Sequence, residues 1–176
     1  MFTTSYKSEG MDHLLTALVR TVNPSKVIEF GTQQGHSAVL LAKGMKRGVV
    51  KTYDIFESNY PNPPHKETHA DMLKALHNVE GYNIEVYAKD VFEVKPVRCD
   101  VLHIDICNHQ KNVYPLLHNW QDKVSKMIIL EGGVLNKWQK KYGFKPFVLP
   151  LRYFKDWRSV IIKGENGYAI TILTRL

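Results

Sequence analysis

A short apolar strand that runs directly into a glycine-bounded loop constrains the fold of this chain most strongly. Residues 26–30 (KVIEF) have the composition of a buried strand, and the loop from Gly31 to Gly35 follows without a break. The next segment, 37–46, has the apolar content of a short helix. Gly31 allows a tight turn and close approach of a ligand, while Gly35 lets the helix pack near the strand. This order indicates an α/β fold with a ligand site at the loop.

The rest of the chain repeats the alternation of helical and extended patterns. Apolar residues at helical spacing predict three further helices, over 11–22, 66–79 and 113–123. Extended patterns predict four further strands, over 49–54, 83–88, 100–104 and 127–130. Two last strands, 158–163 and 168–174, are joined by a Gly-containing connection typical of a hairpin. Pro115 is expected in the first turn of its helix, where a missing N–H is tolerated.

These elements predict a Rossmann-like three-layer sandwich of the α/β class, with a mostly parallel seven-stranded sheet and an antiparallel C-terminal hairpin. The length of 176 residues suits a single domain over 1–176. No stretch reaches the roughly 18 apolar residues of a membrane span, and the first ten residues lack the features of a secretory signal. We therefore expect a cytoplasmic protein with no membrane partner, whose cysteines, Cys99 and Cys107, are free thiols.

The positive charge of the chain is concentrated near its C-terminus. The net charge is +7, and residues 136–176 hold nine Lys and Arg against only Asp156 and Glu165. A basic segment of this kind attracts an anionic partner such as nucleic acid or a phosphorylated metabolite. A solvated basic surface with no partner explains the same composition, so both interpretations stay open.

Acidic residues stand at the ends of four predicted strands. They are Glu29, Asp54, Asp105 and Glu131. In an open α/β sheet, ligands bind outside the carboxyl ends of the strands, so these acids are expected to share one crevice. The loop between Gly31 and Gly35 lacks the middle glycine that a dinucleotide pyrophosphate needs, and no Gly-Lys-Ser/Thr follows as in a P-loop. A nicotinamide dehydrogenase is therefore disfavoured.

In this arrangement the sequence resembles the class I S-adenosylmethionine-dependent methyltransferases. The segment VIEFGTQQGHSA looks like their first motif, Asp54 like the acid that binds the ribose hydroxyls, and DVLHID like their fourth-strand motif. Lys89-Asp90-Val91 looks like the segment that receives the adenine amino group, and the closing hairpin matches the family's reversed last strand. The resemblance covers about residues 10–176 in order.

The resemblance implies S-adenosylmethionine as cofactor and a set of binding residues along the strand ends. Glu29 is implied to fix the loop and contact the methionine moiety. The full set is Glu29, Gly31, Thr32, Gln33, Gly35, Asp54, Ile55, Asp90, Val91 and Asp105. From the residues alone, Asp90 could instead cap the turn before Val91.

A closer similarity is to small O-methyltransferase-like members, whose fourth strand ends in Asp and is soon followed by His. In catechol-type relatives this Asp and an Asp-Asn pair after strand five hold a divalent metal. This chain keeps Asp105 but has Glu131-Gly132 in place of the pair. No metal ligand is therefore assigned, and a divalent metal stays open without being favoured.

Three residues are candidates for catalysis: Asp105, His109 and Glu131. His109 is a candidate general base because an unperturbed histidine titrates near neutrality. His103 lies on the same strand face as Asp105 and is interpreted as a core histidine with a satisfied partner. The simplest interpretation of Trp138 and Tyr142 is that they pack in the core or at its edge. The alternative is that they line an acceptor pocket.

The predicted function is O-methylation of a small or medium-sized acceptor. One alternative is a nucleic-acid methyltransferase that uses the basic segment, although the Asn/Asp-Pro-Pro-Tyr/Phe signature is missing after strand four. The other is a non-catalytic module that binds S-adenosylmethionine. The sequence leaves the oligomeric state open, with a homodimer among the possibilities.

Overall fold

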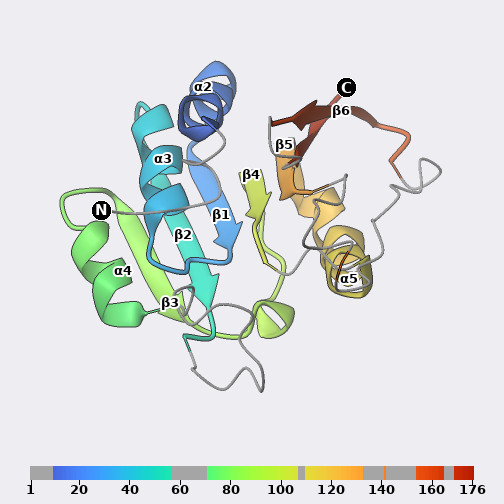
Figure 1. Cartoon of the computed structure of the whole chain (residues 1–176). Helices are drawn as coiled ribbons and strands as arrows, with labels where there is room; N and C mark the ends of the chain where they lie inside the picture. Colours follow the sequence, from blue (N-terminus) through green and yellow to red (C-terminus); the bar gives the residue numbers. More distant parts are fainter. Residues whose placement is uncertain (1–9, 57–70, 107–109, 133–140, 142–153, 165–168) are drawn as a thin grey trace.

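The computed structural model describes residues 10–56, 71–106, 110–132, 141, 154–164 and 169–176 (Figure 1). Within them, seven strands form one sheet in the order β3-β2-β1-β4-β5-β7-β6. The strands are β1 (Lys26–Phe30), β2 (Val49–Asp54), β3 (Ile84–Ala88), β4 (Cys99–Ile104), β5 (Val124–Glu131), β6 (Trp157–Lys163) and β7 (Ala169–Arg175). Strands β1 to β5 pair in parallel, whereas β7 is antiparallel to both β5 and β6. The predicted sheet with its antiparallel C-terminal pair is confirmed.

Helices cover both faces of the sheet and complete the three predicted layers. They are α2 (Asp12–Val22), α3 (His36–Gly44), α4 (Met72–Asn78) and α5 (Gln110–Trp120), with short 3-10 turns η1 (Val91–Glu93) and η2 (Gln121–Lys123). Apolar residues of α2 and α3 join one core cluster, and those of α5 and η1 join the other. Figure 1 shows α2 and α3 on one side of the central strands and α5 on the other. None of the described helices has the length and apolar character needed to cross a bilayer.

Strand β1 takes part in both cores because successive side chains point to opposite faces of a sheet. Val27 packs in the core beneath α2 and α3, while Ile28 and Phe30 pack in the core beneath α5. The ring of Phe30 meets Trp120 of α5 edge to face, with centroids 5.1 Å apart. Glu29 consequently shares a face with Val27 and lies fully buried within the layer of α2 and α3.

The order of the strands reverses direction at β1. The chain leaves β1 through α3 to β2 on one side, and later returns to β4 on the other side. The carboxyl ends of β1 and β4 therefore flank a topological switch point, where ligands of open α/β sheets bind. The loop from Gly31 to Gly35 lies at this point.

Several predicted element boundaries differ from those of the structure. α5 begins at Gln110, so Pro115 is its sixth residue and does not lie in the first turn as predicted. Pro115 is exposed, which keeps its ring away from the packed face of the helix. β5 begins at Val124, three residues before the predicted start, because Val124 pairs with Cys99 of β4. α4 is described only from Met72, where Asp71 caps it, and the predicted part over 66–70 lies outside the described residues.

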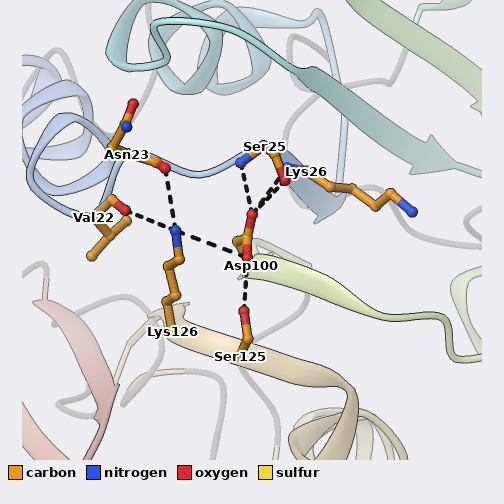
Figure 2. A network of polar contacts seen from close by, with 7 residues as sticks. All are labelled: Val22, Asn23, Ser25, Lys26, Asp100, Ser125 and Lys126. Carbon is orange, nitrogen blue, oxygen red and sulfur yellow. Dashed lines mark hydrogen bonds and ion pairs between the residues drawn. The ribbon is translucent and has the colours of Figure 1, made fainter.

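A polar network joins three strands at the opposite, amino-terminal edge of the sheet (Figure 2). Asp100 accepts hydrogen bonds from the Ser25 N–H at 2.7 Å, from the Ser25 hydroxyl at 2.8 Å and from the Ser125 hydroxyl at 2.8 Å. Lys126 Nζ lies 4.0 Å from Asp100 and also donates to two carbonyl groups at the end of α2. Burial alone would raise the pKa of Asp100, but these donors and the lysine charge lower it to about 2.

Candidate cofactor and catalytic site

Gly31 brings the end of β1 against the end of β4. Its N–H donates to the Tyr53 carbonyl oxygen at 2.9 Å, and the Asp105 N–H donates to the Phe30 carbonyl oxygen at 2.8 Å. Gly31 has a φ of +100°, and a Cβ on it would lie 1.9 Å from the Asp105 carbonyl oxygen. Only glycine fits this approach, so the residue places the loop directly beside Asp105.

The middle of the loop is tied to β2. Gln33 adopts a left-handed φ of 48°, and its N–H donates to Asp54 Oδ2 at 2.8 Å. The hydroxyl groups of Thr32 and Thr52 lie 2.6 Å apart and are buried, so the Thr32 side chain is engaged within the protein. Asp54 is therefore held by the loop through one carboxylate oxygen. The sequence predicted Thr32, Gln33 and Asp54 as cofactor contacts but gave no signal for the direct contact between Gln33 and Asp54.

Gly35 permits a close contact that the sequence did not indicate. The sequence suggested that it lets α3 pack near β1. A Cβ on Gly35 would lie 3.3 Å from the carbonyl oxygen of Ala75, within α4, and 2.9 Å from Cγ1 of Val79, the residue directly after α4. The left-handed φ of +82° starts α3 at this residue. The glycine therefore serves the packing of α4 against the loop.

Glu29 forms a buried pair with His103 of the neighbouring strand. The two residues are register partners in the pairing of β1 with β4, and neither side chain is exposed. Glu29 Oε1 lies 3.0 Å from His103 Nδ1. The second carboxylate oxygen, Oε2, is buried and has no hydrogen-bond partner among the described residues. The interpretation of His103 as a core histidine with a satisfied partner agrees with this geometry.

The four strand-end acids converge as the sequence predicted. The residue Asp105 is partly exposed, but its carboxyl group is desolvated. This desolvation is the largest cause that raises the pKa of the Asp105 carboxyl group well above its ordinary value. The charge of Glu131 and a hydrogen bond with it raise the pKa further. The charges of Glu29 and Asp54 act in the same direction. The other three carboxyl groups therefore lie close enough to Asp105 for their charges to disfavour its ionised form.

The segment after β3 has a capping geometry. Asp90 is exposed, and its Oδ1 accepts from the Phe92 N–H at 2.9 Å, so it caps η1. The sequence left two roles open for Asp90, a cap of the turn before Val91 and a contact with adenine, and this geometry is the cap. The second carboxylate oxygen of Asp90 takes no part in the cap. Val91 is buried in the core, while Ile55 next to Asp54 is 42% exposed. Of Val91 and Ile55, the two apolar residues predicted to contact the cofactor, only Ile55 has a large exposed surface.

A carboxylate–histidine pair that the sequence did not indicate lies at the far end of the loop. Asp12 Oδ2, at the start of α2, is 3.3 Å from His36 Nε2 at the start of α3. Thr16 of α2 also donates to the Leu40 carbonyl oxygen at 3.0 Å, which aligns the two helices. The pairing depends on how α2 packs on α3, and the helical periodicity of either segment does not reveal it.

A family model described as a methyltransferase domain matches residues 28–131, more than half of the chain and all the strand-end acids described above. The chain belongs to this methyltransferase family. The predicted class, an S-adenosylmethionine-dependent methyltransferase, is thereby confirmed. No curated protein matches the sequence of this methyltransferase.

Solved structures share the fold of this methyltransferase at low sequence identity. An O-methyltransferase from Bacillus cereus in complex with SAH is 19% identical, with a TM-score of 0.64 over 99% of this chain and 83% of that one. The N-methyltransferase NodS from Bradyrhizobium japonicum, in complex with S-adenosyl-L-homocysteine (SAH), is 11% identical, with a TM-score of 0.70 over 98% and 88%. The magnesium protoporphyrin IX methyltransferase from Synechocystis, with bound SAH, is 13% identical, with a TM-score of 0.64 over 100% and 89%.

Several predicted features of this methyltransferase lie outside the described residues. They are His109, Cys107, Trp138, Tyr142 and most of the basic segment over 136–153. Where the structure does describe the chain, no group of three or more His, Cys, Asp or Glu side chains is arranged to hold a metal ion. The described catalytic candidates are therefore Asp105 and Glu131.

Proposed function

We propose that this methyltransferase transfers a methyl group from S-adenosylmethionine to a hydroxyl oxygen of a small or medium-sized acceptor. The observation that carries the proposal is Asp105 at the switch point, where burial and the neighbouring Glu131 raise the pKa of its carboxyl group and so suit it to accept a proton. Hydroxyl acceptors must lose a proton during methylation, and a group that titrates closer to neutrality is a better proton acceptor than an ordinary carboxylate.

The residues around the loop fit the cofactor. Asp54 keeps one carboxylate oxygen beyond its bond with Gln33, and a carboxylate suits the two neighbouring hydroxyl groups of a ribose. Ile55 offers an exposed apolar surface next to it for the adenine ring. Asp90 offers its second oxygen to the adenine amino group. Glu29, with one buried oxygen that lacks a donor, suits the positively charged amino group of the methionine moiety.

The bound cofactor supplies a methyl group that is already activated by its sulfonium. The protein has to align the acceptor with that methyl group and exclude water. Asp105 and Glu131 lie at the ends of the adjacent strands β4 and β5, on the side of the loop away from Asp54. In our proposal they orient the acceptor hydroxyl and take up its proton, with His109 as a further candidate base.

Calorimetric titration with SAH tests the cofactor half of the proposal. The wild type should bind, and Asp54→Ala should lose about 1–3 kcal/mol of binding free energy, as expected for a lost charged hydrogen bond. Asp122→Ala is the matched control, because this exposed carboxylate lies in η2 near the opposite edge of the sheet. Absence of SAH binding by the folded wild type would refute the proposal.

Methyl transfer tests the acceptor half. SAH release is measured with a panel of small phenols and aliphatic alcohols, and with amines of matched size. Asp105→Asn should retain SAH binding within a few-fold and lose turnover of the hydroxyl acceptors. Turnover of amines alone, or full turnover by Asp105→Asn, would contradict O-methylation through this pair.

A further inference from the structure

The Glu29–His103 pair lies directly beneath the loop and has no contact with solvent. Both side chains are fully buried, and 3.0 Å separates Glu29 Oε1 from His103 Nδ1. We assign the shared proton to Nδ1, so that the ring donates and the carboxylate oxygen accepts. A buried carboxylate without such a donor would be strongly destabilised. His103 therefore determines which way the Glu29 carboxylate is turned.

The unused oxygen of this carboxylate points to a missing ligand. Two buried side-chain oxygen atoms among the described residues lack a hydrogen-bond partner: Glu29 Oε2 and Asp12 Oδ1. In each carboxylate the other oxygen contacts a histidine ring nitrogen, His103 in the first case and His36 in the second. Glu29 lies two residues before Gly31, and His36 directly follows Gly35, so both atoms flank the same loop. Buried acceptors without donors are rare in native proteins and call for an explanation.

We propose that His103 is a positioning residue for the cofactor. By donating Nδ1–H to Oε1, it holds the Glu29 carboxylate so that Oε2 receives the charged amino group of the amino-acid part of the cofactor. The inference rests on the proposed function, because it assumes that S-adenosylmethionine occupies the loop. His103 itself touches neither the donor methyl group nor the acceptor in this account.

The electrostatics of the crevice support this placement. The charge of Glu29 is among the causes that raise the pKa of Asp105, so the two carboxyl groups lie close enough for their charges to interact. A cationic amino group bound at Oε2 would offset the negative charge that gathers there. A histidine that only fills the core would have no effect on which part of the cofactor is bound.

Two conservative variants separate the roles of the two ring nitrogens. His103→Asn places an amide N–H near the position of Nδ1, whereas His103→Gln places one near Nε2. We expect His103→Asn to bind SAH within about threefold of the wild type and His103→Gln to lose at least about tenfold, the cost of one unmade charged hydrogen bond. Thermal unfolding of both variants without ligand shows that each is folded. The control is His77→Gln, which replaces an exposed histidine of α4.

A second ligand identifies the part of the cofactor that is affected. Titration with 5′-methylthioadenosine, which lacks the amino-acid part, should give the same affinity for the wild type and both variants. Equal SAH affinities of the Asn and Gln variants would overturn the role of His103 while leaving the proposed function intact. Equal losses for SAH and 5′-methylthioadenosine would assign His103 to the core alone. A wild type that binds neither ligand would overturn the proposed function itself.

Discussion

Replacement of Asp100 by asparagine should destabilise the fold at neutral pH and have a much smaller effect in strong acid. Asp100 lies at the start of β4 and joins it to Ser25 before β1 and to Ser125 in β5 (Figure 2). Asparagine keeps the shape of the side chain but carries no charge. One of the two accepting oxygens is replaced by an NH2 group, which cannot accept a hydrogen bond, and the other accepts more weakly. The change also removes the attraction to Lys126.

The magnitude follows from the pKa of Asp100. A carboxyl group whose pKa falls from 3.8 in the unfolded chain to about 2 in the fold stabilises the fold by about 2 kcal/mol when it is ionised. Because the pKa is lower in the folded state, this stabilisation is complete above pH 3.8 and is lost as the pH falls towards about 2. Only 19% of the side chain is exposed, so solvent screening is limited. A loss of this size lowers the Tm of a chain of this length by roughly 4–8 °C.

Urea unfolding followed by circular dichroism measures the effect. Wild type, Asp100→Asn and the control Asp122→Asn are compared at neutral pH and at an acidic pH where the wild type still unfolds cooperatively. Asp122 is an exposed carboxylate at the same edge of the sheet. The reasoning is refuted if Asp100→Asn and Asp122→Asn are equally stable at neutral pH, or if the difference between them does not shrink in acid.

Three further predictions concern the loop, the acidic crevice and the core. Gly31→Ala should cost about 2–4 kcal/mol of stability, because its Cβ would meet the Asp105 carbonyl oxygen at 1.9 Å. Gly81→Ala, which also has a positive φ but open space around it, should cost only about 1 kcal/mol in the same urea titration. Asp105→Asn should raise the Tm at neutral pH and lose this advantage in acid, because a carboxyl group with a raised pKa stabilises the fold only while protonated; parallel Tm–pH curves would contradict this. Burial raises the pKa of the Cys99 thiol to about 12, so mass spectrometry should find it alkylated by iodoacetamide only after unfolding.

Local patterns in the sequence were sufficient to predict the sheet and to bring the four strand-end acids to one edge of it. The alternation of apolar runs and helical periodicity predicted the seven strands, since each pattern lies within one short segment. Parallel strands have their carboxyl ends at one edge, so acids at four strand ends implied one crevice before any contact was known. The same period of two predicted that His103 and Asp105, the residue directly after β4, lie on one face.

Contacts between distant segments could not be predicted in this way. Glu29 and His103 are 74 residues apart, and their pairing depends on the register of β1 against β4. The contact of Gly35 with α4 and the pair of Asp12 with His36 depend on helix packing, which periodicity does not specify. A raised pKa likewise depends on burial and on the distances between charges. The sequence by itself therefore determined which residues share an edge, while the tertiary structure decided which of them touch and which oxygen atoms remain for a ligand.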